Sequence, residues 1–155
     1  MATTHNTDQE VRARVNDVPV YEFASTPFTQ PPALANARVA IVTTAGLRTE
    51  GNAHWQPGDE SFSVFDVTAR NLRLAHFSPN FDRSGFALDL NVVYPIDRLH
   101  ELAACKVIGS VASKHISFMG AQLDHNLATM RLDTGPAAAR LLRDDGVDVV
   151  LLTPV

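Results

Sequence analysis

The sequence predicts an α/β fold, an open and mostly parallel sheet flanked by helices in a Rossmann-like three-layer arrangement, with an extended N-terminal arm. Two short apolar runs, at residues 38–44 and 147–152, have the composition of strands buried in a parallel sheet. A helical pattern, a glycine and the second of these runs follow one another over residues 134–152, which is half of a β–α–β crossover. Strands interleaved with helices favour this class over an all-helical or all-strand fold.

Residues 1–37 are predicted to form the extended arm. Four prolines punctuate it, and proline fixes φ and removes a backbone donor. Tyr21, Phe23 and Phe28 offer apolar anchors for wrapping the domain or a partner. Residues 38–155 are then expected to form a single α/β domain, because the whole chain of 155 residues fits one domain and is long enough to bury a core.

Extended segments are predicted at six places in this domain: 38–44, 61–67, 72–77, 88–94, 107–119 and 147–152. The first opens into a long loop at residues 45–61, which shows neither helical nor strand period. Loops at the carboxyl ends of parallel strands form the ligand crevice of open α/β sheets. The segment at 88–94 is predicted as a strand because it is apolar and is closed by Pro95.

Two helices are predicted from their periodicity and their end signals. Apolar residues repeat with helical spacing from Ile96 to Ala103, and Pro95 suits the first turn because its missing N–H is harmless there. A second helix begins at the Thr-Gly-Pro sequence of residues 134–136 and ends at Gly146. Each helix therefore lies between two predicted extended segments.

Charge and hydropathy exclude two kinds of partner. The formal net charge is −4, and the 13 lysines and arginines are spread without a basic stripe, so no nucleic-acid partner is expected. No apolar run reaches the roughly 18 residues of a membrane-spanning helix, so no membrane partner is expected. The first ten residues are polar and lack the basic start and apolar run of a signal peptide, which predicts a soluble, cytoplasmic protein.

Cys105 is the only cysteine, which excludes an internal disulfide. Its place at the end of the first predicted helix is typical of a small, half-buried packing residue. Alternatively, Lys106 beside it would lower the pKa of a reactive thiol. No GxGxxG, GxxxxGK or GxSxG pattern is present, so neither a nucleotide cofactor nor a serine hydrolase is predicted.

The candidate catalytic residues are two histidines and two carboxylates beside predicted strand ends: His76, Asp82, Asp89 and His115. Such groups shuttle protons or bind metals. Their spacing matches no metal motif, so no metal site is predicted from them. Carboxylates next to turns also cap backbone N–H groups, and that structural interpretation stays open for both aspartates.

The candidate substrate-binding residues lie in the turns that end predicted strands. Thr44 and Gly46 open the loop after residues 38–44, and Met119 lies in the turn after residues 107–119. Asn91 and Arg98 flank the Tyr-Pro turn, where they either hold a substrate carboxylate or tie that turn to the sheet.

These residues belong to motifs that follow the order of a known family. The motifs are VTTAG at 42–46, GDESF at 58–62, His76 with Asp82, DLNVVYPIDRL at 89–99, IG at 108–109, His115 with SFMG at 117–120, DGVD at 145–148, and LLTPV at 151–155. Through them, residues 38–155 resemble the short, stand-alone branch of the glycine/sarcosine/betaine reductase component B family. The selenoprotein subunit of D-proline reductase is related to the same family.

The resemblance implies a component of a selenol- or thiol-dependent reductase that cleaves a C–N bond in a small amino or amide-type substrate. In this family a selenocysteine or cysteine just beyond the last matched strand attacks the substrate carbon and displaces the amine. Better-known members act with a partner subunit whose pyruvoyl group activates the amino substrate. The redox residue is therefore expected directly after Val155, and an in-frame UGA codon read as a stop would explain a chain truncated there. No other cofactor is expected.

That position also suits the chemistry, because a thiolate or selenolate at the carboxyl end of a buried strand gains from the N-terminus of the next helix. In this interpretation Asn91 or Arg98 orients the substrate, and His76 or His115 handles the proton of the leaving group. Two other functions stay open. One is a non-catalytic binding module that associates with a second reductase subunit or with itself, and the other is a metal-dependent enzyme built on the histidines and aspartates.

Overall fold

The structure is a computed structural model, and it describes residues 9–10, 13, 24–25, 29–51, 54–79, 83–122 and 127–155. The chain divides into two units, Met1–Gln30 and Pro31–Val155. Tyr21, Phe23 and Phe28 lie outside the described residues, so docking of the arm through them stays a prediction. The 3-10 helix η1 (Leu34–Asn36) belongs to the second unit.

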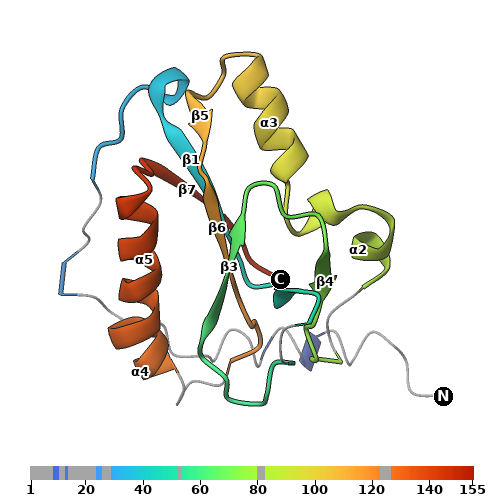
Figure 1. The fold of residues 1–155 in the computed structure, drawn as a ribbon. Helices are drawn as coiled ribbons and strands as arrows, with labels where there is room; N and C mark the ends of the chain where they lie inside the picture. The colour runs from blue at the N-terminus through green and yellow to red at the C-terminus, as the bar shows by residue number, and fades with distance from the viewer. Residues whose placement is uncertain are drawn as a thin grey trace. The chain divides into compact units, whose positions relative to one another are not determined.

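The second unit is built on a mostly parallel sheet with helices on both faces, which confirms the predicted α/β class (Figure 1). Strand β1 (Arg38–Thr43) lies in the middle of the sheet. On one side it pairs with β5 (Ser110–Val111) and then β6 (Lys114–Phe118), and on the other with β7 (Val149–Thr153), all in parallel. Strand β3 (Phe62–Asp66) pairs antiparallel with β6.

A second, two-stranded sheet is made by one strand from the predicted long loop and one strand that follows β3 in the sequence. It pairs β2 (Leu47–Thr49) antiparallel with β4 (Leu72–Leu74). The strand predicted at residues 72–77 is therefore present but shorter, and part of the predicted loop at 45–61 is a strand.

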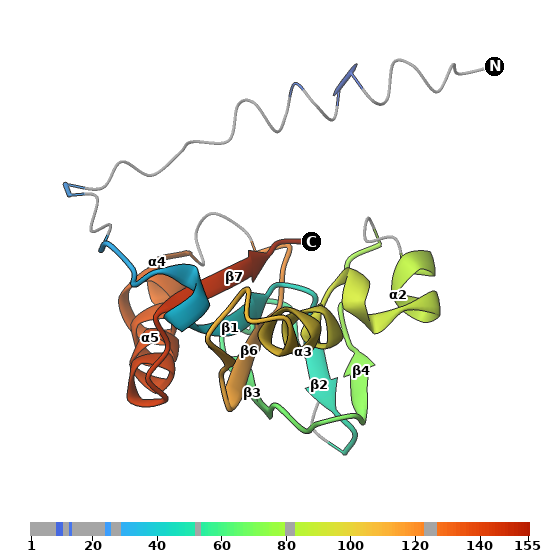
Figure 2. The same ribbon diagram turned by 90° about the horizontal axis from the view of Figure 1, so that it is seen from above.

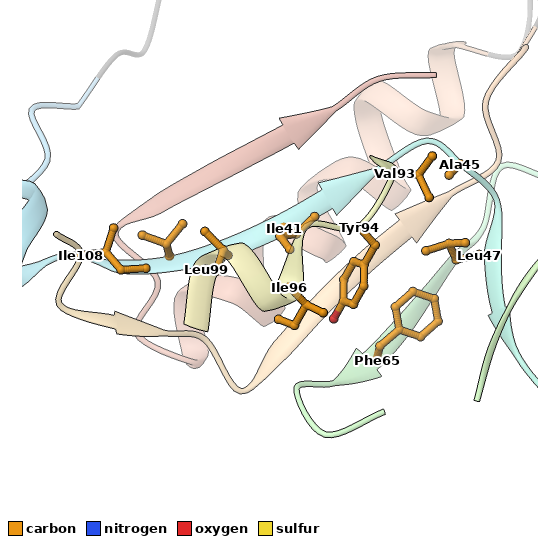
Figure 3. Close-up of a cluster of buried hydrophobic side chains, with 10 residues drawn as sticks. Ile41, Ala45, Leu47, Phe65, Val93, Tyr94, Ile96, Leu99 and Ile108 are labelled. Atoms are coloured by element: carbon orange, nitrogen blue, oxygen red, sulfur yellow. The ribbon is translucent and has the colours of Figure 1, made fainter. Parts of the chain in front are cut away.

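The two main helices pack on opposite faces of β1, because successive residues of a strand point to opposite sides. Helix α3 (Ile96–Ala104) shares a core cluster with Val39 and Ile41, whereas α5 (Gly135–Asp144) shares another with Ala40. Figure 3 shows Ile96 and Leu99 of α3 lying against Ile41. Both predicted helices are thus confirmed, and together they make the outer layers.

Shorter helical segments connect these elements. They are α2 (Ser84–Leu88), the 3-10 helix η2 (Leu90–Val92), α4 (Leu127–Thr129) and the π-helix η4 (Met130–Thr134). The last two lead directly into α5, so Thr134 has helical dihedral angles and makes no side-chain cap. Helix α5 thus begins within the predicted start at residues 134–136, but helical turns precede it and the predicted cap by Thr134 is wrong.

The strand predicted at residues 88–94 is wrong. Asp89 has an extended backbone, but its carboxylate accepts the N–H of Asn91 and so caps the 3-10 helix η2. A side chain that bonds its own local backbone competes with strand pairing. Val93 and Tyr94 after it are buried, which explains the apolar pattern without a strand.

The pairing register of β1 changes between its two neighbours β5 and β6. From Val39 to Val42 of β1, the partner chain advances from Val111 to Ile116, two residues more than in a regular ladder. The N–H of Ile41 falls in this interruption and donates instead to Nδ1 of His115, at 2.9 Å. A histidine side chain thus replaces a missing backbone acceptor in the middle of the sheet.

Strand β7 lies at the sheet edge in the described structure, where it pairs with β1 alone (Figure 2). Its apolar sequence predicted a central strand, and this placement is a correction. Val150, Leu151 and Leu152 are exposed even though five residues of β7 are paired with β1.

Candidate functional site

The carboxyl ends of β1, β6 and β7 meet around Thr44. The N–H of Thr44 donates to the carbonyl oxygen of Thr153 at 3.2 Å, and its Oγ1 accepts the N–H of Val155 at 2.9 Å. The N–H of Gly120, just after β6, donates to the carbonyl oxygen of Thr44 at 2.8 Å. One residue thus ties the ends of the two neighbouring strands together.

Gly120 is enclosed on three sides by polar atoms. A Cβ at this position would lie 2.8 Å from the oxygen of Thr44, 3.0 Å from Nε2 of His76 and 3.1 Å from the oxygen of Val155. The first of these distances is to backbone, so any larger residue would push the strand ends apart. Glycine therefore allows His76 and the chain after β7 to approach one another.

Gly46 plays a similar part on the other side of His76. It has a positive φ of 63°, and a Cβ there would lie 3.1 Å from Sδ of Met119 and 3.2 Å from the backbone of His76. Its carbonyl oxygen accepts the indole N–H of Trp55 at 2.9 Å and the N–H of Ala75 at 3.1 Å. The segment that carries His76 is therefore fastened to the end of β1.

His76 itself is 95% buried, and hydrogen bonds hold both its ring and its backbone. Its Nδ1 accepts the N–H of Ser78 at 3.3 Å, and its carbonyl oxygen accepts from the guanidinium of Arg83 at 2.7 Å. Burial, and then the charge of Arg83, lower the pKa of His76 from its ordinary value of 6.5. The neutral ring consequently carries its proton on Nε2, the nitrogen beside Gly120.

The structure thus brings together four of the predicted site residues, namely His76, Thr44, Gly46 and Met119. Of these, only Thr44 has appreciable exposure, so they form a packed cluster at the carboxyl ends of the strands. Asp82 lies outside the described residues, and its predicted role stays a prediction.

His115 does not lie in this cluster, and its predicted place in the crevice is corrected. It is completely buried, and its ring meets that of Tyr94 edge-on with centroids 5.5 Å apart. Burial lowers the pKa of His115 to about 4, so the ring is neutral at pH 7. With Nδ1 accepting from Ile41, the side chain completes the sheet.

Asp89, Asn91 and Arg98 form a separate group around the start of α3. Asn91 donates from Nδ2 to the carboxylates of Asp89 and Asp97, each at 2.9 Å, and Arg98 pairs with Glu101 at 2.7 Å. Hydrogen bonds from Asn91 lower the pKa of Asp89. The structure thus supports the capping interpretation of Asp89 and the turn-tying interpretation of Asn91.

The group of Asp89, Asn91 and Arg98 also lies at the carboxyl ends of the strands. The hydroxyl of Thr153, at the end of β7, donates to the carbonyl oxygen of Val93 at 3.0 Å. The turn between η2 and α3 is therefore fastened to the strand that ends beside Thr44 and His76.

Cys105 is exposed at the end of α3, so its half-buried interpretation is wrong. Among the described residues, no three His, Cys, Asp or Glu side chains are placed to hold a metal ion. In the same part of the chain, no helix has the length and apolar composition to cross a membrane.

Sequence reasoning missed two members of the cluster, Gly120 and Val155, as contacts of His76. Both lie inside the motifs SFMG and LLTPV, but only the structure shows that these chain ends converge. The signal that was available is a glycine directly after a buried strand, which marks a close approach of backbone.

Comparison with known proteins agrees with the resemblance in sequence. A sequence model of the glycine/sarcosine/betaine reductase selenoprotein B family matches residues 12–155. D-proline reductase subunit gamma of Acetoanaerobium sticklandii is 34% identical over 137 residues, which cover 82% of this chain and 55% of that protein. Sarcosine reductase complex component B subunit beta of Peptoclostridium acidaminophilum is 26% identical over 126 residues, covering 77% of this chain and 28% of that protein.

The chain therefore spans about half the length of one curated relative and less than a third of the other. No solved structure matches it. Because the family match covers nearly the whole chain, the protein belongs to the glycine/sarcosine/betaine reductase selenoprotein B family.

Proposed function

We propose that this protein is a component of a selenol- or thiol-dependent reductase that cleaves the C–N bond of a small amino or amide-type substrate. The observation that carries the proposal is the convergence of His76 Nε2, the Thr44 carbonyl and the Val155 carbonyl around Gly120, at the carboxyl ends of parallel strands. Ligands of open α/β sheets bind at this kind of edge. The names of the two relatives, reductase subunits for D-proline and sarcosine, agree with it.

The redox residue is proposed to follow Val155 directly, and the cluster fits such a group. Because Gly120 has no Cβ, the Val155 carbonyl and His76 Nε2 lie close to one another, so a residue directly after Val155 would begin near His76. A selenol or thiol in this place would supply the electron pair that attacks the substrate carbon and displaces the amine. Thr44, through its hydrogen bonds to Val155, would hold the backbone that presents it.

His76 is proposed to act as a hydrogen-bond donor in this site. Burial lowers the pKa of its ring, and Ser78 donates to Nδ1, so the N–H is at Nε2, the nitrogen beside Gly120. A donated hydrogen bond stabilises a selenolate or thiolate and lowers its pKa. This role needs no change of protonation by His76 itself.

The first test is to sequence the gene beyond the codon of Val155. A UGA codon followed by an in-frame, helix-coding segment supports the proposal. Another stop codon, or no such segment, contradicts it.

The second test uses a protein with a cysteine directly after Val155 and the residues that the gene encodes next. With a dithiol reductant and the neighbouring subunits, amine release or ring opening is expected from one of glycine, sarcosine, betaine and D-proline. Substrate reduction by the 155-residue chain alone would contradict the proposed redox residue.

The role of His76 is tested separately on the same cysteine protein. The rate of thiol alkylation against pH gives the thiol pKa, whose ordinary value is about 8.5. Replacing His76→Ala is expected to raise that pKa by about one unit, and His76→Gln, which keeps a side-chain N–H donor, by less. Gly120→Ala should also disturb the thiol, whereas Gly85→Ala, whose Cβ would be 3.5 Å from Val92, is the matched control. Equal thiol pKa values in all four variants would remove His76 from the site.

A non-catalytic role as a binding subunit is the second candidate. The exposed apolar strand β7 favours it, because such an edge is suited to pairing with other polypeptide. It predicts that the cysteine form binds the neighbouring subunits yet reduces none of the four substrates.

A further inference from the structure

Strand β7 is apolar on both of its faces, and each face has an exposed apolar side chain. Val150 and Leu151 are 38% and 39% exposed, and Leu152 is 68% exposed. Successive residues alternate between faces, so the exposure is not confined to one side of the sheet. Near-continuous apolar runs of this kind occur in parallel strands that are buried on both faces.

A groove runs along one of these faces, between β7 and α5. It has a volume of about 440 Å³ and is lined by Val150 and Leu152 of β7 and by Ala138, Ala139 and Leu142 of α5. Two small residues, Gly135 and Ala139, lie one turn apart on α5 and line it. Small residues allow a second helix to approach α5 closely.

The topology indicates what kind of element fits this groove. The chain goes from β6 through α5 to β7, and so crosses β1 on the face that α5 covers. A crossover of the same hand that continues outward from β7 must place its helix on that same face. Figure 2 shows that α5 lies near β7 and that β7 ends the row of strands β3, β6 and β1. The groove therefore lies where the next helix of a regular α/β sheet would pack.

We infer that a helix and then a parallel strand are encoded after Val155. The helix packs into the groove beside α5, and the strand pairs with the outer edge of β7. The inference rests on the proposed function, which already places the redox residue after Val155. The matched region makes up 55% of D-proline reductase subunit gamma, so that relative contains the additional polypeptide that such elements need. A helix in this groove would begin next to Thr44 and His76, and its N-terminus would stabilise an anion there.

The test compares two proteins, the 155-residue chain and the same chain extended through the downstream reading frame with serine in place of the redox residue. Hydrogen exchange is measured on the amides of Val149–Thr153. In the extended protein the outward-facing amides are expected to exchange at least about tenfold more slowly, because an added strand pairs with them. Unchanged exchange would overturn the inference.

A matched pair of substitutions locates the covered surface. Leu152→Lys tests the groove, and Leu132→Lys on η4 is the control, because Leu132 is 66% exposed. In the 155-residue chain, both changes should leave the melting temperature nearly unaltered. In the extended protein Leu152→Lys is expected to lower it by about 5 °C or more, since a buried lysine is costly, and Leu132→Lys should not. Equal shifts for the two variants would contradict the assignment.

Two further results would show that the edge of β7 is not covered by a downstream segment of the same chain. Exchange protection that rises with concentration in the 155-residue chain, together with a dimer by light scattering, would assign the edge to a second copy and overturn the inference. A gene without further in-frame residues would do the same. A missing reading frame would overturn both proposals. Because the serine form has no redox residue, protection of β7 in it supports the inference even if the cysteine form reduces no substrate, and this result separates the two proposals.

Discussion

Strands β1 and β7 are nearly alike in sequence and opposite in surroundings. RVAIVT and VVLLT pair in parallel along five residues, yet Val39, Ala40 and Ile41 are buried while Val150, Leu151 and Leu152 are exposed. Side-chain packing on both faces holds β1, whereas β7 is held mainly by its backbone ladder and by contacts at its two ends. An apolar pattern therefore indicates which surface a strand is suited to bury, and the fold determines how much of that surface is covered.

The largest expected effect is a difference in the free energy of unfolding between truncating a side chain of β1 and truncating one of β7. Replacing Ile41→Ala should lower the free energy of unfolding by about 3 to 4 kcal/mol, because the residue is completely buried and leaves a cavity. Leu151→Ala, its paired neighbour in β7, should cost less than about 1 kcal/mol. Urea unfolding of the 155-residue chain measures both, and equal losses would show that β7 is covered in solution.

The next effect concerns the start of β1, where Asp145, which precedes β7 in the sequence, links β1 to the start of β6. Its carboxylate accepts from Arg38, from the N–H and hydroxyl of Ser113 and from the N–H of Lys114, at distances of 2.6 to 3.1 Å. Replacing Asp145→Asn should cost about 2 kcal/mol, because an amide nitrogen cannot accept these bonds.

The same residue predicts an acid-sensitive range of stability. Burial disfavours the charged form of Asp145, but these hydrogen bonds outweigh it and lower the pKa from 3.8 to about 2. The stabilisation is therefore complete above pH 3.8 and is lost as the pH falls toward 2. The melting temperature of Asp145→Asn should lack this loss between pH 3.8 and 2. The same pH dependence in wild type and variant would contradict the assignment to Asp145.

A smaller effect is expected from His115, which supports β1 in the middle of the sheet. Because burial lowers its pKa from 6.5 to about 4, the unfolded chain binds a proton on this residue before the folded one does. Stability should therefore fall as the pH drops from 6.5 toward 4. Replacing His115→Leu should cost about 1 to 2 kcal/mol at pH 7, since the N–H of Ile41 loses its acceptor.

The pH dependence provides the check on this assignment. The difference between wild type and His115→Leu should shrink between pH 6.5 and 4, as measured by urea unfolding at several pH values. A constant difference would mean that His115 does not titrate in this range.

The smallest effect concerns the carboxyl ends of the two strands. Replacing Thr44→Val removes the acceptor for the N–H of Val155 and should cost about 1 kcal/mol or less, because the site is partly exposed. Hydrogen exchange of Val155 should speed up while that of Ile41 stays unchanged. Faster exchange at both amides would show that the end of β7 is not an independent contact.

The sequence predicted the elements whose pattern and local signals agree. The helix predicted from Ile96 to Ala103 and the strands predicted at 38–44 and 147–152 are present as α3, β1 and β7. Thr44, Gly46 and Met119 lie together because each follows or ends a strand of the same sheet. The apolar pattern at residues 88–94 predicted a strand, but the side chain of Asp89 caps a 3-10 helix there instead. His115 was misplaced because the two-residue interruption between β5 and β6 is visible only when the strands are paired.

The contacts of Arg38 also bear on the order in which the chain is made. Its backbone N–H donates to Asp148, 110 residues later, and its carbonyl oxygen accepts the N–H of the same residue. During synthesis β1 leaves the ribosome early, and β7 emerges after all the other described strands of the sheet. The nascent chain must therefore carry β1 with one edge unpaired until β7 has been made, more than 100 residues later.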